Sequence, residues 1–277
     1  MNDGGGKMDR RILNDYHMHS SISPDTEAAM EEMCEAACQR GLKEVVFTDH
    51  YEFYAYGITR PYFNESYLEH YFSVLEQCSR RYEGRITVKS GMEFGQSHLD
   101  LQRAKDIADR FSFDYLIGSV HKIDNIDLEK LEYTEDTVEE IARRYYESLL
   151  ELSETGVFDC IGHIDLFKRH CRRHGFPDQY DLYEHVIRRV LQNVIKRGKG
   201  IEINTSGLRQ ASGETMPGLN VLRLYKELGG TIITAGSDAH RPVDVGSGLD
   251  EACALMRRAG FCHIAVYNQR KHSLESI

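Results

Sequence analysis

Short apolar runs alternate with longer amphipathic stretches along nearly the whole chain. Runs of four to eight residues rich in β-branched and apolar side chains predict strands, whereas stretches of ten or more with helical periodicity predict helices. The predicted strands cover residues 12–19, 44–48, 86–92, 115–120, 157–162, 200–204 and 231–235. The predicted helices cover residues 26–40, 65–82, 99–111, 135–154, a segment ending near 197, 217–229 and 250–259, before a last apolar run at 264–267.

This alternation of strand and helix indicates an α/β fold with parallel strands joined by right-handed crossovers. Seven or eight such units in one chain favour a closed barrel over an open sheet. Because the loops vary in length and the last strand is weak, we expect a distorted, TIM-barrel-like closure. Residues 12–277 are predicted to form this single domain, and residues 1–11, with three consecutive glycines, a flexible leader.

Polar side chains fall where the predicted strands end. His17 and His19 lie at the end of the first predicted strand. Side chains two residues apart on a strand face the same side, so both imidazoles can bind one metal ion. A single pair with this spacing is equally consistent with two histidines that bind no metal. The pattern recurs, however, at the ends of later strands, with His50, Glu93, His121, His163, Asp238 and His240.

In a barrel of this type the C-terminal strand ends converge on one face, where catalytic groups sit. Six of the 13 histidines occupy such ends. Histidine with carboxylate suits Zn²⁺, Mn²⁺ or Fe²⁺, whereas Mg²⁺ and Ca²⁺ prefer oxygen ligands. With Asp25 included, nine ligands are too many for one ion, because a catalytic zinc uses about three protein ligands. We therefore expect two or three divalent ions. His98, in a loop after Glu93, is a further pocket residue or a surface histidine.

The charge and composition of the chain limit the classes of partner that it can bind. The formal charge of -10 argues against a nucleic-acid surface, which needs clustered Lys and Arg. It does not argue against a small anionic substrate, because bound cations reverse the local sign. No apolar run is long enough for a membrane span or a signal peptide. Seven cysteines without a CxxC pair indicate a reduced, cytoplasmic protein.

The motifs, in this order, resemble those of the PHP (polymerase and histidinol phosphatase) family. They cover almost the whole chain after the leader, and together they are far more specific than each alone. The resemblance implies a distorted (β/α)₇ barrel with a trinuclear metal site at its C-terminal face. The motifs are His17-Met18-His19, Thr48-Asp49-His50, Gly91-Met92-Glu93, Ser119-Val120-His121, Gly162-His163 and Gly236-Ser237-Asp238-Ala239-His240.

The resemblance also implies a set of ligands for each ion. The first ion would be held by His17, His19, Glu93 and Asp238. Glu93 would bridge to a second ion held by His121 and His163, and the third would be held by Asp25, His50 and His240. Some members of the family have His where this chain has Asp25. Asp25 is a harder ligand, and capping of the following helix is its alternative role.

Within the family, two segments resemble the histidinol-phosphate phosphatases. These are His163–Arg169 and Asn204–Arg209, and each brings an arginine to the barrel mouth. A guanidinium matches phosphate oxygens bidentately, so Arg169 and Arg209 are expected to bind the substrate's phosphate. The expected reaction is hydrolysis of L-histidinol phosphate.

For several further residues the sequence leaves two interpretations open. Asp165 and His240 are the two candidates for protonating the leaving group. Asp15 and Asp49 either orient neighbouring metal histidines or are ordinary turn carboxylates. Four tyrosines of the loop after His50 either form a lid or pack on the barrel, namely Tyr51, Tyr54, Tyr56 and Tyr62.

Three alternatives remain. Amidohydrolase barrels also begin with HxH, and many bridge their ions with a carboxylated lysine, for which Lys89 lies four residues before Glu93. Another PHP phosphoesterase, such as an exonuclease, would act on a different ester. A non-catalytic metal-binding module would be expected to have lost ligands, yet no strand-end position is empty. The oligomeric state stays open.

Overall fold

The barrel is built from seven parallel strands in one sheet. The structure is a computed structural model that describes residues 11–277, so the predicted leader lies outside the described residues except for Arg11. A short additional strand, β3 (His50–Glu52), pairs with β4. In sheet order the seven strands are β1 (Asn14–Met18), β2 (Glu44–Phe47), β4 (Thr87–Gly95), β5 (Tyr115–Ser119), β8 (Cys160–Ile161), β9 (Gly200–Asn204) and β10 (Ile233–Gly236).

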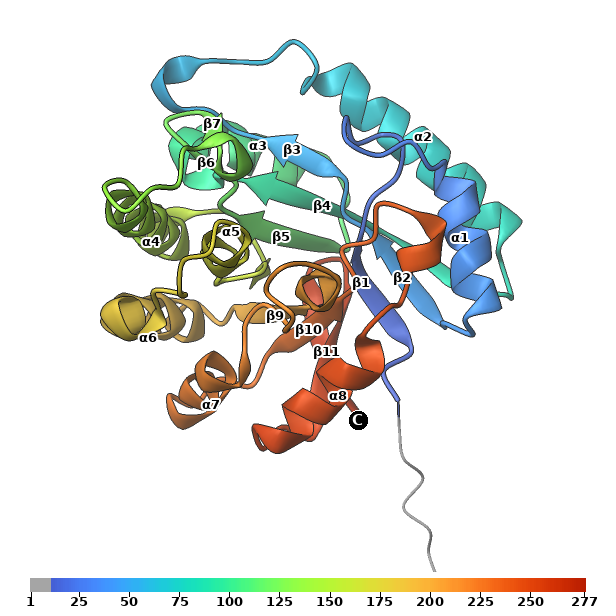
Figure 1. Cartoon of the computed structure of the whole chain (residues 1–277). Coiled ribbons are helices and arrows are strands. Elements are labelled where there is room, and N and C mark those ends of the chain that lie inside the picture. The colour runs from blue at the N-terminus through green and yellow to red at the C-terminus, as the bar shows by residue number, and fades with distance from the viewer. Residues whose placement is uncertain (1–10) are drawn as a thin grey trace, which may run out of the picture.

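The sheet closes just beyond the end of β10. The backbone N–H of His19 donates to the carbonyl of Ala239 at 2.9 Å, and the N–H of Asp238 donates to the carbonyl of His17 at 2.7 Å. These bonds join β1 to the last strand and bring two predicted ligand segments side by side (Figure 1). The predicted distorted barrel of seven units is confirmed.

The helices surround the strands as an outer layer (Figure 1). Each buries an apolar stripe, as α4 does with Ile141, Tyr145, Leu149 and Leu152 at helical spacing. The helices are α1 (Met30–Gln39), α2 (Glu65–Arg81), α3 (Leu101–Arg110), α4 (Val138–Thr155), α5 (Phe167–Arg173), α6 (Tyr180–Lys196), α7 (Leu219–Glu227) and α8 (Leu249–Arg258). Single 3₁₀ turns are η1 (Ala55–Gly57), η2 (Ser97–Asp100), η3 (Leu128–Lys130), η4 (Ser206–Arg209) and η5 (Pro242–Asp244). None of the helices in residues 11–277 has the length and hydrophobicity needed to span a bilayer.

Some elements differ from the predicted ones. Glu93 lies inside β4 rather than at its end, because β4 runs on to Gly95. The segment between the predicted strand 115–120 and the predicted helix 135–154 contains a small hairpin, β6 (Lys122–Ile123) with β7 (Ile126–Asp127). Helix α5 was not predicted, since seven residues are too few to establish a helical period.

A C-terminal hairpin closes the N-terminal end of the barrel. The predicted run at 264–267 lies in β11 (His263–Asn268), which pairs antiparallel with β12 (Lys271–Ser276). Tyr267 packs against Tyr16 and Tyr115 inside the barrel. The guanidinium of Arg270 lies 2.8 Å from the carboxylate of Asp159, just before β8. The hairpin therefore fills one end, and the other end is left for the polar strand ends.

Candidate active site

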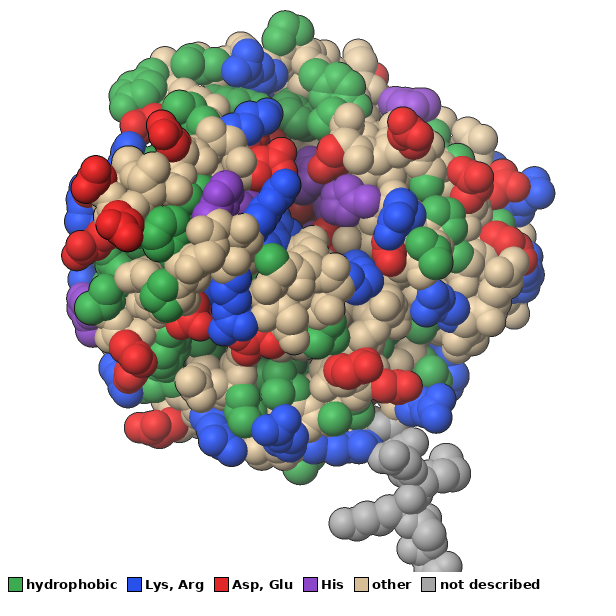
Figure 2. All heavy atoms as spheres, in the orientation of Figure 1, with side chains coloured by type: hydrophobic (Ala, Val, Ile, Leu, Met, Phe, Trp, Pro, Cys, Tyr) green, Lys and Arg blue, Asp and Glu red, His purple; other side chains and the backbone are tan. Residues whose placement is uncertain are grey.

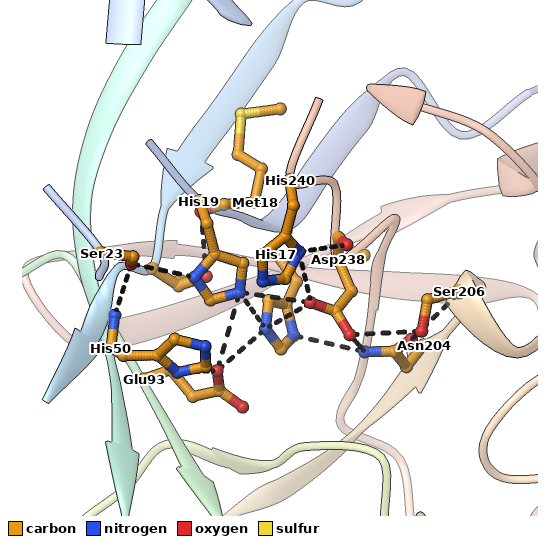
Figure 3. A network of polar contacts seen from close by, with 12 residues as sticks. His17, Met18, His19, Ser23, His50, Glu93, Asn204, Ser206, Asp238 and His240 are labelled. Atoms are coloured by element: carbon orange, nitrogen blue, oxygen red, sulfur yellow. Dashed lines mark hydrogen bonds and ion pairs between the residues drawn. The ribbon is translucent and has the colours of Figure 1, made fainter. Parts of the chain in front are cut away.

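Six histidines and three carboxylates meet at the C-terminal end of the barrel. In the orientation of Figure 1, histidine and acidic side chains line the floor of a hollow with Lys and Arg beside it (Figure 2). The close view shows imidazoles from β1, β3 and the loop after β10 turned toward Glu93 and Asp238 (Figure 3). All nine predicted ligands are brought together here, namely His17, His19, Asp25, His50, Glu93, His121, His163, Asp238 and His240.

One group of donors surrounds the end of β1. The Nε2 atoms of His17 and His19 lie 3.2 Å apart. Oε2 of Glu93 is 3.3 Å from Nε2 of His17, and Oδ1 of Asp238 is 3.2 Å from Nε2 of His19. Tetrahedral ligands at bond lengths of about 2.0–2.1 Å lie roughly 3.4 Å from one another. This group therefore has the spacing of one coordination shell.

A second group uses the other oxygen of Glu93. Oε1 lies 2.9 Å from Nε2 of His163 and 3.1 Å from Nε2 of His121, and these two nitrogens are 3.4 Å apart. The hydroxyl of Ser119 donates to the same oxygen at 2.6 Å. Oε1 of Glu93 thus faces His121 and His163. Oε2 faces His17, His19 and His50, so this carboxylate has the geometry of a bridging ligand.

The third group lies nearer to solvent. Oδ2 of Asp25 is 3.2 Å from Nε2 of His50 and 3.3 Å from Nε2 of His240. Helix α1 begins at Met30 with Ala29 as its N-cap, so Asp25 does not cap that helix. The carboxylate is instead directed at two histidines from distant parts of the chain.

Buried atoms without hydrogen bonds show that these groups fit cations. Oε2 of Glu93 and Nδ1 of His50 are both buried and lack a hydrogen-bond partner among the described residues, although they lie only 3.0 Å apart. Leaving such atoms unpaired is costly, and a cation between them would remove the cost. The mixture of imidazole and carboxylate suits Zn²⁺, Mn²⁺ or Fe²⁺. Two or three divalent ions therefore fit this site.

The ligands strongly perturb one another's protonation. Burial alone would lower the pKa of His17 and His50, but the surrounding carboxylates, Glu202 and Glu93 among them, raise both pKa values well above the usual range. In the same way, Glu93 and Glu52 outweigh burial and raise the pKa of His121 to about 9. The ion-free site thus holds protons at the positions where ions would bind.

Metal loading of the ion-free protein is therefore expected to release protons. An imidazole with a raised pKa is protonated at about pH 7.5, and it gives up that proton when its lone pair binds an ion. We expect about two or more protons to leave per chain, measured by zinc titration calorimetry in buffers of different ionisation enthalpy. Heats that do not depend on the buffer would contradict this.

Two carboxylates that the sequence analysis missed hold the ligand histidines in place. Oε1 of Glu202 lies 2.6 Å from Nδ1 of His17, and Oε1 of Glu52 lies 2.7 Å from Nδ1 of His121. Each carboxylate accepts the Nδ1–H, which leaves the Nε2 lone pair free for an ion. A glutamate between two isoleucines of the buried strand β9 was the available signal for Glu202.

Replacing Glu202 by Gln is expected to weaken metal binding about 10–100-fold, because His17 loses the negatively charged partner that orients its ring. The check is the zinc dissociation constant by competition with a chromophoric chelator. Glu44→Gln is the control, since Glu44 pairs with Lys89 at the opposite end of the barrel. An equal loss of affinity in both variants would point to a general loss of structure.

Asp15 and Asp49 do not contact the imidazoles. Asp15 accepts the backbone N–H of Ser237 at 2.8 Å. Asp49 accepts the N–H of Ser20 at 2.7 Å and the hydroxyl of Ser23 at 2.7 Å. Both carboxylates therefore fix the backbone segments that carry the ligands, rather than the imidazole rings.

A pocket of ≈ 440 Å³ opens above the metal ligands, and Arg169 lines it. Arg209, the second predicted phosphate ligand, does not. Its guanidinium donates to the carbonyl of Ser237 at 2.8 Å and lies 3.4 Å from a carboxylate oxygen of Asp244. These acceptors hold the guanidinium beside the Asp238 loop, and a role of Arg209 in binding phosphate stays a prediction.

Asp165 and His98 also lie outside the pocket. Oδ2 of Asp165 is 2.8 Å from Nζ of Lys168 on α5, and both side chains are buried. Nε2 of His98 is 3.2 Å from the hydroxyl of Ser148 on α4, and its side chain is buried. The roles expected of these two residues at the substrate stay predictions, whereas His240, the other proposed acid, lines the pocket.

The four tyrosines after His50 lie in different surroundings. Tyr51 packs in the core, and its hydroxyl donates to the carbonyl of Phe63. Tyr54 lines the pocket, but Tyr56 is 86% exposed, and Tyr62 donates to the carbonyl of Ile22.

Lys89 is not a bridging ligand. Its Nζ lies 2.7 Å from Oε2 of Glu44 and donates to the carbonyl of Tyr267 at the N-terminal end of the barrel. The amidohydrolase arrangement with a lysine between the ions is therefore not present, and Glu93 occupies that position.

Known proteins resemble this chain over nearly its whole length. A model of the PHP domain family matches residues 15–206. A histidinol-phosphatase of Lactococcus lactis is 28% identical over 263 residues, 93% of this chain and 95% of that protein. A probable histidinol-phosphatase of Thermotoga maritima is 30% identical over 252 residues, 91% of this chain and 94% of its own length.

Solved structures give the same fold. The Lactococcus lactis histidinol phosphate phosphatase, in complex with zinc, L-histidinol and phosphate, superposes with a TM-score of 0.77 at 27% identity. The match covers 94% of this chain and 98% of that one. A putative histidinol phosphatase of Listeria monocytogenes superposes with a TM-score of 0.73 over 87% of this chain, at 22% identity.

Proposed function

The chain belongs to the PHP domain family, and we propose that it is a metal-dependent phosphomonoesterase that hydrolyses L-histidinol phosphate to L-histidinol and phosphate. The observation that carries the proposal is Glu93, whose two oxygens face separate sets of imidazoles beneath a pocket lined by Arg169. The relatives of Lactococcus lactis and Thermotoga maritima support the choice of substrate.

The nine ligands would hold up to three ions, in the three groups described above. When bound, such ions supply Lewis acidity, which lowers the pKa of water and offsets phosphate charge. Arg169 would bind the phosphate oxygens and stabilise charge that develops on them. Ser119 fixes the position of Glu93 by donating to it. Of the two residues considered for protonating the leaving alkoxide, only His240 lines the pocket, and its Nε2 is directed at Asp25.

The test is phosphate release from L-histidinol phosphate beside a panel of other phosphomonoesters, with metal content measured on the same sample. We expect a strong preference for L-histidinol phosphate that chelation abolishes. Metal-dependent hydrolysis of the other esters but not of L-histidinol phosphate would support a phosphatase and exclude this substrate. No hydrolysis with ions bound would favour a binding module.

We also propose that the protein is a cytoplasmic enzyme that acts on a small molecule. All seven cysteines are free, as in a reducing compartment. The net charge of -10 disfavours a nucleic-acid substrate. Residues 12–277 would form the catalytic domain.

A further inference from the structure

A closed ring of hydrogen bonds holds His121 in place. His121 lies just after β5, Glu52 is the last residue of β3, and Gln96 follows the end of β4. Strand β4 pairs with both β3 and β5, and Glu52 lies opposite Gly95 in the register of β3 with β4 (Figure 1). Side chains from three strand ends are thus close enough to bond one another.

Gln96 binds the backbone of His121 and the carboxylate of Glu52 with opposite ends of its amide. Its Oε1 accepts the backbone N–H of His121 at 2.6 Å and that of Lys122 at 3.2 Å. Because a backbone N–H only donates, the atom that faces these groups is the carbonyl oxygen. The amide nitrogen Nε2 donates to Oε2 of Glu52 at 2.9 Å and to the carbonyl of Phe53 at 3.3 Å. The orientation of the amide is therefore determined.

Glu52 completes the ring. Its Oε1 lies 2.7 Å from Nδ1 of His121 and accepts the proton of that nitrogen, which leaves Nε2 free for an ion. Its Oε2 accepts from Gln96 and lies 3.1 Å from Nζ of Lys122. His121 is thus held at its backbone N–H and at its ring by two side chains that also hold each other.

The backbone at the end of β4 is shaped for this ring. A Cβ atom on Gly95 would lie 2.4 Å from the carboxylate of Glu52, so a side chain at this position would displace that carboxylate. Gln96 is fully buried and has φ 55° and ψ 42°, in the left-handed region that favours glycine. Backbone preference does not explain a glutamine here, whereas the two ends of its amide do.

We propose that Gln96 is a positioning residue for the second ion, because its ring with Glu52 fixes where Nε2 of His121 lies. That nitrogen is 3.1 Å from Oε1 of Glu93 and 3.4 Å from Nε2 of His163. Without the ring His121 can turn about its side-chain bonds, and the second group loses one of its donors. The inference rests on the proposed function only in requiring an ion at this group, and it does not depend on which ester is hydrolysed.

The test is the zinc affinity of Gln96→Glu, Glu52→Gln and the double variant that carries both changes. Gln96→Glu sets two carboxylates against each other, and Glu52→Gln sets two amides against each other. The double variant exchanges the amide and the carboxylate, so that each bond of the ring again has a donor and an acceptor. We expect each single change to weaken binding of the second ion about 10–100-fold, and the double variant to recover to within about 3-fold of the unchanged protein.

Affinity is measured by competition with a chromophoric chelator, together with metal content after dialysis. Gln102→Glu is the matched control, because the amide of Gln102 donates to the carboxylate of Asp106 at 2.7 Å on the exposed side of α3. Thermal unfolding of the ion-free proteins separates positioning of an ion ligand from stabilisation of the fold. If Gln96→Glu does not fold, Gln96→Met takes its place, since it keeps the length of the side chain and removes both ends of the amide.

Three results would overturn the inference. These are unchanged zinc affinity in the Gln96 variant, a double variant that loses as much affinity as the two single changes combined, and a loss of thermal stability without a loss of affinity. No substrate enters these measurements. A protein that binds zinc in a Gln96-dependent way and hydrolyses no phosphate ester would therefore contradict the proposed function and support this inference.

Discussion

Replacing Glu93 by Gln is expected to lower kcat/KM for L-histidinol phosphate by about 10³-fold or more, and to reduce the bound metal at the same time. The carboxylate is buried, and its oxygens face His17 and His50 on one side and His121 and His163 on the other. A neutral amide keeps the shape, but its nitrogen replaces one of the two anionic donors. Loss of charge stabilisation worth about 4 kcal/mol corresponds to this factor.

The measurement is steady-state kinetics together with metal analysis of the purified variant. Glu44→Gln, at the opposite end of the barrel, is the control for loss of the charge of a half-buried, paired glutamate. Thermal unfolding of the ion-free proteins would show whether the fold survives. A Glu93→Gln variant with full activity and its normal metal content would rule out the bridging role.

Replacing Arg169 by Met is expected to lower kcat/KM about 10²–10³-fold while leaving the metal content as it was. Arg169 is the pocket-lining arginine on α5, and its loss removes a donor from the phosphate at the point where charge develops. Burial lowers the pKa of its guanidinium, but an arginine remains charged at neutral pH. The variant therefore loses a full positive charge.

Arg172→Met is the matched control for this prediction. Arg172 lies on the same helix, but it pairs with Asp178 and Glu214 and does not line the pocket. Kinetics at several substrate concentrations, with inorganic phosphate as an inhibitor, separate the effects. We expect weaker inhibition by phosphate in Arg169→Met only. If the two variants had the same kinetics, Arg169 would have no role in binding the phosphate.

Local patterns in the sequence were enough to predict the barrel and most of the candidate metal ligands. The alternation of strand and helix determines that strands are parallel and that their C-terminal ends share one face. Strand periodicity places His17 and His19 on the same side. These are short-range properties of the chain, so eight of the nine candidate ligands could be placed at strand ends without knowing any distance between them. Asp25 lies outside that pattern, and its role followed from the resemblance to the PHP family.

Only the tertiary structure decided which distant side chains meet. Glu202 reaches His17 from 185 positions away, and no local pattern specifies that pairing. Arg209 and Asp165 stand in motifs that predict a site, but Ser237, Asp244 and Lys168 provide nearer partners. A polar group that is buried during folding takes the partner that packing brings to it. The sequence by itself therefore determined the strand ends and their chemistry, whereas three-dimensional packing decided the orientation of each polar side chain and hence the walls of the pocket.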